Sequence, residues 1–166
     1  MSQSEQTAPR DAVGEVDVLT RREIEAQIAA PLLEAFMQEF GHERALAVAQ
    51  RVIRSLALAS GRSMGAACKG NSVQHLLEAM RRFAAGGALE IEPVAPDCGT
   101  FGFDVVRCRY AEMYKAHGLQ AFGPLLSCAR DYALVEGFNP RIRLTRTQTI
   151  MEGGDRCDFR FTMDGE

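Results

Sequence analysis

The sequence lacks closely spaced cysteine pairs, long apolar runs and any basic stretch at its beginning. There is no C-x-x-C segment, which excludes the usual zinc-ribbon and thioredoxin motifs. No apolar run approaches the roughly 18–20 residues of a membrane span. Residues 1–6 do not begin a basic region followed by an apolar one, so we expect no secretory signal and a cytoplasmic location.

An excess of positive charge is also absent. Nineteen Lys and Arg residues stand against 22 Asp and Glu residues, which gives a formal net charge of −3. A mildly acidic chain without a basic block is a poor ligand for a phosphate backbone, so we expect no nucleic-acid partner and no membrane partner. With 166 residues, of which 46% are hydrophobic and 25% charged, the chain is typical of one globular domain. A domain of this size needs neither a disulfide nor a metal to be stable.

The chain does contain cysteine, in an odd number. The five are Cys68, Cys98, Cys108, Cys128 and Cys157. In a reducing compartment structural disulfides are rare. Each cysteine is therefore either a small buried apolar side chain or a source of thiolate for nucleophilic attack or metal binding.

The pattern of residue types divides the chain into a tail and one domain. Residues 1–19 are polar without a helical or strand period, which predicts a disordered tail. Thr20 and Glu23 form a capping box that predicts a helix start. Residues 20–164 then form a single α+β domain, with a helical part over 20–86 and a sheet-and-helix part over 87–164.

In the helical part, apolar residues recur at helix spacing up to Gly41: Ile24, Ile28, Leu32, Phe36 and Phe40. A second helix is expected over 42–59, and it should be well buried near its end. A loop bracketed by glycines is expected over 61–70. A third helix should then run from 71–72 to the glycines at 86–87. The second half predicts strands over 88–94, 101–106, 141–151 and 156–163, and helices over 109–116 and 124–137. The fold expected is N-terminal helices packed with an antiparallel sheet of about four strands.

Residues that fit poorly into a simple core occur in this second half. Cys128 and Asp131 are three positions apart on a predicted helix and share one face. Cys108 ends a strand, and Cys157 is on the apolar side of the last strand. These side chains could converge in one pocket, as a thiolate assisted by a carboxylate or tyrosine, or as a zinc-binding Cys/Asp set. The structural alternative is three buried cysteines and a solvated Asp131.

Arg146 falls on the apolar side of its predicted strand. A buried arginine needs an anion, so Arg146 is expected to hold a substrate carboxylate or to pair with Asp131 or Glu152. The three histidines fall at helix starts and ends, and nothing in the pattern connects one of them to a cysteine.

Three segments carry a resemblance to a known family. They are LTRREIEAQIAAPLLEAF, RCRYAEMYKAHGL and GPLLSCARDYALVEGFNPRIRLTRTQTIMEGGDRCDFRF. They resemble the L-2-amino-thiazoline-4-carboxylic acid hydrolase family over about residues 19–161. The resemblance implies a hydrolase that acts on C–N or C–S bonds of a small cyclic substrate, opening a 2-aminothiazoline ring to give N-carbamoyl-L-cysteine.

The resemblance also implies a set of site residues. The motif positions we expect to be catalytic are Cys108, Glu112, Cys128, Asp131 and Cys157. Those expected to bind substrate are Tyr110, Asn139, Arg146, Thr147 and Glu152. Cys68 and Cys98 lie outside the motifs and are expected to be structural. The resemblance establishes no cofactor, and a divalent metal such as zinc stays an open alternative.

Two further expectations concern other classes of function. A helical cap over an antiparallel sheet that ends in a glycine turn and C-x-F is similar to the small-molecule-binding domain of the 4-vinyl reductase type, which implies a ligand sensor without catalysis. The apolar stripe from Ile24 to Phe40 could lie on a neighbouring subunit, which predicts a homo-oligomer formed through the N-terminal helices.

Overall fold

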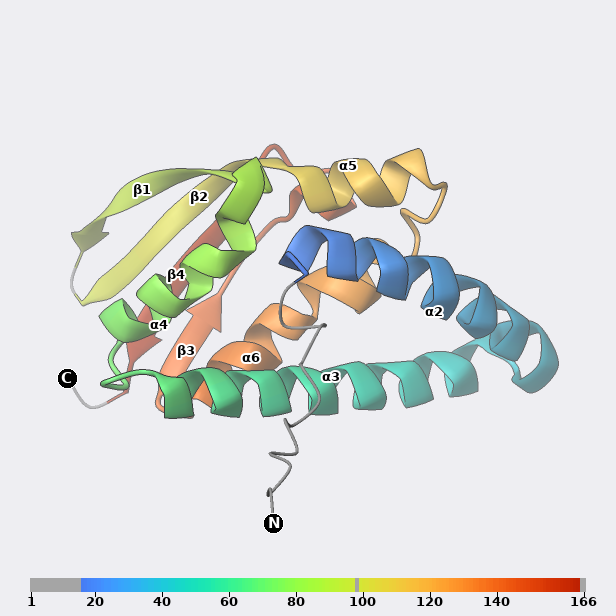
Figure 1. Cartoon of the computed structure of the whole chain (residues 1–166), viewed down its shortest axis with the longest axis horizontal. Coiled ribbons are helices and arrows are strands. Elements are labelled where there is room, and N and C mark those ends of the chain that lie inside the picture. The colour runs from blue at the N-terminus through green and yellow to red at the C-terminus, as the bar shows by residue number, and fades with distance from the viewer. Residues whose placement is uncertain (1–15, 98, 165–166) are drawn as a thin grey trace, which may run out of the picture.

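The computed structural model describes residues 16–97 and 99–164 and confirms the α+β class (Figure 1). Most of the predicted tail lies outside the described residues. The first helix, α2, covers Val18–Phe40, so it begins before Thr20. Its N-cap is Asp17, whose carboxylate accepts the Thr20 amide at 3.0 Å and the Thr20 hydroxyl at 2.6 Å. The capping box expected at Thr20 is therefore wrong, because the Thr20 hydroxyl donates to this cap.

The second helix, α3, runs from His42 to Ala67 and passes through the expected glycine loop. Glycine is needed there for close packing and not for a turn. A Cβ at Gly61 would lie 2.1 Å from the backbone oxygen of Leu134, and one at Gly137 would lie 2.3 Å from the backbone oxygen of Leu58. The two helices that carry these glycines therefore touch backbone to backbone, which fixes the wall of the site described below.

The remaining helices are short. Ser72 caps α4, Val73–Met80, through the His75 amide, and a 3-10 segment, η1, follows over Arg81–Gly87. The segments of the second half are α5 (Arg109–Ala116), the π-helical turn η2 (Pro124–Cys128), α6 (Arg130–Phe138) and the 3-10 turn η3 (Ile150–Glu152). The helix expected over 124–137 thus begins with a wide turn, in which the Ala129 amide bonds the Pro124 oxygen at 2.8 Å.

The sheet has the four antiparallel strands that the sequence predicts. They are β1 (Leu89–Asp97), β2 (Thr100–Cys108), β3 (Ile142–Thr145) and β4 (Cys157–Met163), in the order β1-β2-β4-β3. Pro93 lies on the edge strand β1, where its missing N–H costs least. The strand expected over 141–151 ends at Thr145, because the Asp158 carboxylate draws the next residues into a turn by accepting the Thr147 and Gln148 amides, each at 2.9 Å.

The main core lies between one face of the sheet and helices α3, α4 and α6. Phe103, Phe159 and Phe161 pack side by side from β2 and β4, with the first two rings stacked at 4.8 Å. A second cluster joins α2 to α5 through Ala26, Ala30 and the fully buried Tyr114, and it extends to Leu126 of η2. The first helix therefore packs on the body through its small residues.

The large apolar residues on one side of α2 and α3 lie at the surface of the chain. The side chains of Ile24, Ile28, Leu32, Phe36 and Phe40 are each about half exposed. On α3, Val48, Val52 and Leu56 are exposed to a similar degree. The prediction that the second helix is well buried near the end of its expected range is wrong at these positions, because α3 presents Ala57, Gly61 and Met64 to the body.

Candidate functional site

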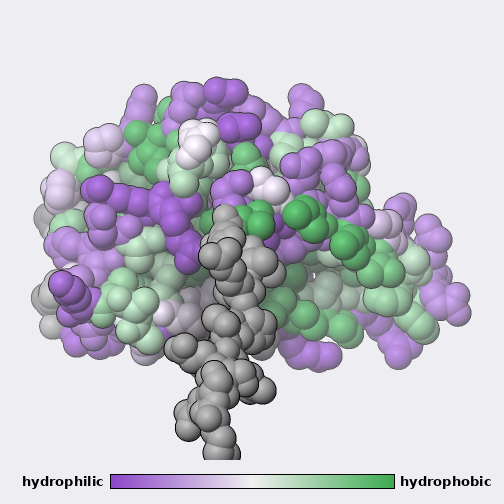
Figure 2. All heavy atoms as spheres, viewed as in Figure 1, coloured by the Kyte–Doolittle hydropathy of each residue, from purple (hydrophilic) through white to green (hydrophobic). Residues whose placement is uncertain are grey.

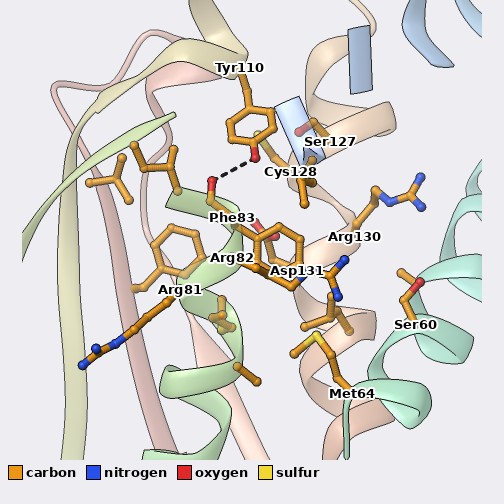
Figure 3. A pocket seen from close by; sticks show the side chains of 18 of the residues that line it. Ser60, Met64, Arg81, Arg82, Phe83, Tyr110, Ser127, Cys128, Arg130 and Asp131 are labelled. Atoms are coloured by element: carbon orange, nitrogen blue, oxygen red, sulfur yellow. Dashed lines mark hydrogen bonds between the residues drawn. The ribbon is translucent and has the colours of Figure 1, made fainter. Parts of the chain in front are cut away.

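A cavity of about 1010 Å³ lies between the sheet, η1 and the helices α2, α3 and α6 (Figure 3). Its lower wall in the close-up includes Met64 and Ser60 of α3, and Phe83 comes from η1. Apolar and aromatic side chains such as Leu77, Phe103 and Phe159 form much of the lining. A mostly apolar hollow with a few polar groups is the usual form of a small-molecule site.

The structure brings six of the ten predicted site residues to this cavity. They are Cys108, Tyr110, Cys128, Asp131, Arg146 and Cys157. They come from β2, the start of α5, η2, α6, the turn after β3 and β4, so the fold collects them from separate segments of the second half. Figure 3 shows Tyr110, Cys128 and Asp131 around the same space. Asp131 and Cys128 share a face, as their spacing predicts.

The strongest polar contact in the cavity joins Arg146 and Asp131. Nη1 of Arg146 donates to Oδ2 of Asp131 at 2.7 Å, and Nη2 donates to the backbone oxygen of Cys128 at 3.2 Å. The arginine side chain is 4% exposed and lies over the rings of Tyr132 and Phe159, at 5.4 and 4.9 Å from their centroids. Of the anions expected for Arg146, the structure supplies Asp131.

Asp131 keeps a free edge toward the cavity. Its side chain is 30% exposed, and among the described residues Oδ1 has no hydrogen-bond partner. Burial raises the pKa of this carboxyl above its usual range, while Arg146 acts in the opposite direction. A carboxyl group with a raised pKa in a cavity can exchange a proton with a bound molecule.

The three cavity cysteines are held as neutral thiols. Burial raises the pKa of Cys108 to about 11 and raises the pKa of Cys128 well above its ordinary value. Cys157 shifts in the same direction for the same reason, and its sulfur accepts the Ile150 amide at 3.3 Å. Asp131 adds to each increase, because a neighbouring negative charge disfavours a thiolate.

Tyr110 is oriented by a hydrogen bond. Its hydroxyl donates to the backbone oxygen of Phe83 at 2.9 Å, shown as the dashed line in Figure 3. Burial raises the pKa of this phenol to about 12, so it stays protonated at neutral pH. The bond connects the start of α5 to η1 and so fixes two walls of the cavity relative to each other.

Two predicted site residues lie at surface or turn positions. Glu112 is on the outer side of α5, where it accepts from Nε of Arg107 at 2.7 Å. This ion pair lowers the pKa of the Glu112 carboxyl. Glu152 lies in η3, where it accepts from the Thr149 hydroxyl at 2.7 Å. Neither lines the cavity, and their local partners account for both side chains.

Asn139 and Thr147 also have local roles. The buried Asn139 donates to the backbone oxygen of Asn71 at 2.8 Å and accepts from the Arg141 amide at 3.0 Å, so it connects two loops. The Thr147 hydroxyl donates to Asp158 at 2.6 Å and stabilises the turn after β3. A short motif in the sequence does not distinguish such supports of a turn from groups that touch a ligand.

The cavity also contains arginines that the motifs did not indicate. Arg22 of α2 and Arg130 of α6 line it with side chains that are 13% and 11% exposed. In the sequence, Arg22 lies in a polar stretch at the start of a helix. Such a stretch is typical of a solvent-exposed face, so it does not indicate that Arg22 lines a cavity. The signal for Arg130 is its place between the inward Cys128 and Asp131, although the sequence alone does not show that it is buried.

Cys68, expected to be structural, packs against the main core and also lines the cavity. Cys98 lies outside the described residues. Within residues 16–97 and 99–164, no group of three His, Cys, Asp or Glu side chains is arranged to hold a metal ion. In the same part of the chain, none of the helices combines the length and apolarity that crossing a membrane requires.

Comparisons with known proteins give a family and a likeness of fold. The profile of the family described as L-2-amino-thiazoline-4-carboxylic acid hydrolase matches residues 21–161. No match was found among curated protein sequences. Among solved structures, the chain is similar to the phenol-responsive sensory domain of the transcription activator PoxR, with a TM-score of 0.53 and 14% identity. That similarity covers 83% of this chain and 74% of the other, and it is a likeness of fold.

Proposed function

Since the chain belongs to the L-2-amino-thiazoline-4-carboxylic acid hydrolase family, we propose that its cavity binds and hydrolyses a small nitrogen- and sulfur-containing ring. The observation that carries the proposal is the free edge of Asp131 in a largely apolar cavity. A carboxyl group that is fixed on one oxygen by Arg146 and open on the other is suited to proton transfer at a bound ring.

The cavity suits a substrate of this class in size and polarity. Ligand sites commonly occupy about 300–1,000 Å³ and are mainly apolar. The volume of about 1010 Å³ is at the upper end of this range and leaves space for water beside a single ring. Phe83 and Phe103 line the cavity with aromatic rings against which a ring can pack.

The proposed reaction is the addition of water to the ring carbon between nitrogen and sulfur. The Asp131 carboxylate takes a proton from the attacking water, and the oxygen forms a bond to the carbon. The carbon–sulfur bond then breaks, and the carbon–oxygen bond becomes a carbonyl. One water proton ends on the ring nitrogen and the other on sulfur, so the products are one carbamoyl group and one thiol.

The cysteines act as part of the cavity wall in this proposal. With the pKa of Cys108 at about 11, the thiolate is a small minority at neutral pH. Attack by a thiol would need a base, and among the described residues Asp131 is the acidic side chain that lines the cavity. If the Asp131 carboxylate instead takes a proton from water, the reaction needs no covalent intermediate.

The proposal is tested by incubating the full chain with 2-aminothiazoline-4-carboxylate. We expect one new thiol per molecule consumed, measured with a colorimetric thiol reagent, and the carbamoyl product by mass spectrometry. Protein thiols are subtracted with a sample that lacks substrate. If the compound binds in calorimetry and stays intact, or if neither it nor 2-aminothiazoline binds, hydrolysis of this ring class is excluded.

A second candidate is small-molecule binding without catalysis. It is favoured by the neutral thiols and by the likeness of fold to a sensory domain that responds to phenol. An apolar cavity with a hydrogen-bonding edge at Asp131 would also accept an uncharged aromatic ring. Binding of phenol with no turnover of any thiazoline would support this candidate against the hydrolase.

A further inference from the structure

The charge of the cavity is opposite to that of the chain. Six arginines line it: Arg21, Arg22, Arg81, Arg82, Arg130 and Arg146. Among the described lining residues, Asp131 is the acidic one that opposes them. A protein with a net charge of −3 therefore concentrates positive charge around one hollow, which attracts small anions.

These arginines differ in how far their charge is already compensated. Asp131 neutralises Arg146 at 2.7 Å. Arg81 is 78% exposed and pairs with Glu78. Arg22 and Arg130 share a single carboxylate, that of Glu25, which is hydrogen-bonded to Arg22 and lies 3.8 Å from Nη1 of Arg130. Two guanidinium groups facing one partly exposed carboxylate leave one positive charge in surplus.

Of Arg22, Arg130 and Arg146, Arg130 is the least satisfied. The residue is 9% exposed, and its guanidinium makes no hydrogen bond to another residue in the described part of the chain. A guanidinium has five N–H donors, and a buried one without acceptors is costly. Burial is the main cause that lowers the pKa of Arg130, and the positive charge of the neighbouring Arg22 acts in the same direction.

A second unsatisfied polar group occurs in the same region. The Tyr114 side chain is fully buried, and its hydroxyl has no hydrogen-bond partner among the described residues. Arg22, Glu25 and Arg130 are among the charges that act on this phenol. The chain therefore has an unused guanidinium and an unused hydroxyl in one region.

We infer that Arg22 and Arg130 form an anion-binding subsite of the cavity, which takes the carboxylate of a small organic acid. A carboxylate accepts two parallel N–H bonds from one guanidinium, and Arg130 has the donors free. The subsite deepens the proposed function, on which it rests only for the identity of the ring. It places the carboxylate on the pair Arg22 and Arg130 and leaves Arg146 to orient Asp131.

The test compares two ring compounds that differ in charge. We expect benzoate to bind the full chain about 10- to 100-fold more tightly than benzamide in calorimetry, since charge-assisted hydrogen bonds are the stronger ones. Arg130→Met should reduce this preference to about threefold or less. Arg62→Met removes an exposed arginine of α3 that does not line the cavity and should leave the preference unchanged.

Two further measurements keep the outcome clear. Arg130→Lys retains a positive charge and should keep part of the preference, and it replaces Arg130→Met if thermal unfolding shows that variant to be misfolded. Equal binding of benzoate and benzamide by the wild type, or an unchanged preference in folded Arg130→Met, overturns the subsite. Ring hydrolysis without a benzoate preference overturns the subsite alone, and a preference without hydrolysis overturns the proposed function alone.

A separate observation concerns the exposed apolar face of α2 and α3. We define this face by Ile24, Ile28, Leu32, Phe36, Phe40, Val48, Val52 and Leu56. Figure 2 shows it as a run of apolar surface over the two helices. Eight side chains at about half exposure present roughly 700 Å², which is more than most monomers expose in one patch and near the ~800 Å² per partner of a standard interface.

The charges on α2 and α3 indicate that a second copy of this chain fits the face. Beyond Glu25, which Arg22 and Arg130 share, α2 carries Glu34 and Glu39 and no lysine or arginine. In contrast, α3 carries four arginines, of which Arg54 pairs with Glu136, and one glutamate. A two-fold axis that places α2 of one copy on α3 of the other would match acidic to basic surface twice. Residues 1–15 contain Met1 and Val13 as their large apolar side chains, which is too few to cover the face.

We propose that this face is the interface of a homodimer. Light scattering of the full chain at about 50 µM should give twice the mass of one chain. The double variant Ile28→Glu/Phe36→Glu should be a folded monomer, because each glutamate would be buried unpaired in the interface. Gln50→Glu adds a charge at an exposed position of α3 outside the face and should remain dimeric.

The dimer proposal has two contrary outcomes. A monomeric wild type at this concentration overturns it. So does a folded double variant that is still dimeric, because the copies would then meet elsewhere. A monomeric wild type that binds lipid vesicles through the face would assign the surface to a membrane instead.

Discussion

Replacing Asp131 by asparagine is expected to lower kcat for ring hydrolysis by about 10²–10⁴-fold, the usual contribution of a positioned acid or base. Asparagine has the same shape, and its carbonyl oxygen can still accept from Arg146. The change removes the group that carries the proton while it leaves the cavity filled. KM should change little, because Asp131 is expected to act on the water and the reacting carbon.

The pH profile distinguishes this role from a structural one. The proposed base is the carboxylate, so activity should rise with pH as Asp131 loses its proton. Burial raises the pKa of this carboxyl, so the rise should occur above the usual range of an aspartate. Asp131→Asn should retain no such rise in its residual activity.

Glu136→Gln provides the matched control for Asp131→Asn. Glu136 is an exposed acid on the same helix, α6, and pairs with Arg54 at 2.7 Å. Its replacement should leave kcat within about twofold, because surface ion pairs contribute little. Asp131→Asn with wild-type kcat and an unchanged pH profile would remove Asp131 from the chemistry.

Replacing Arg146 by methionine is expected to lower the free energy of unfolding by about 3–5 kcal/mol, measured by urea denaturation at pH 7.5. The change removes the partner of a buried carboxylate, the bond to the Cys128 oxygen and two ring contacts. Breaking one side of a buried ion pair costs more than the pair contributes, since the remaining charge is left uncompensated.

The pH dependence of this loss has a definite sign. Without Arg146, the pKa of Asp131 in the folded state should rise further above its unfolded value, because Arg146 lowers it more than the neighbouring Arg22 and Arg130 do. Stability is then present below the unfolded pKa and is lost as pH rises through the folded pKa. The deficit of Arg146→Met should accordingly be smaller at pH 5 than at pH 8.

Two variants complete the Arg146 experiment. The double variant Arg146→Met/Asp131→Leu should recover much of the loss, because neither charge then remains buried. Arg143→Met removes an exposed arginine of β3 that pairs with Asp164 at 3.1 Å, and it should cost at most about 1 kcal/mol. A double variant no more stable than Arg146→Met would show that the ring packing of Arg146, and not its charge, accounts for the loss.

Local patterns in the sequence predicted much of the fold. Alternation and turn residues placed four antiparallel strands. These local patterns gave a wrong prediction where a glycine allows two helices to pack closely. Gly61 reads as a loop signal, yet it lies inside α3, because the backbone of α6 approaches it too closely for a side chain. Such a contact joins residues that are more than 70 positions apart and has no local signature.

The residues of the candidate site were also predicted only in part from the sequence. Motif resemblance found Cys108, Cys128, Asp131, Arg146 and Cys157, which do meet around one cavity. It also selected Glu112, Asn139, Thr147 and Glu152, whose partners in the structure are a surface arginine, loop backbones and turn residues. A motif records which residues occur together in the sequence and does not separate the ligand side of a turn from its supporting side.

The sequence by itself determined the α+β class, the family and the need of Arg146 for an anion, because each depends on composition, periodicity or a local run of residues. Only the tertiary structure decided which anion Arg146 takes, that the cysteines are neutral, and that Arg22 and Arg130 face the same cavity. Burial and pairing depend on segments that are distant in the chain. The stripe from Ile24 to Phe40 has helix spacing in the sequence, and only the packing of Ala26 and Ala30 on the body shows that it faces outward.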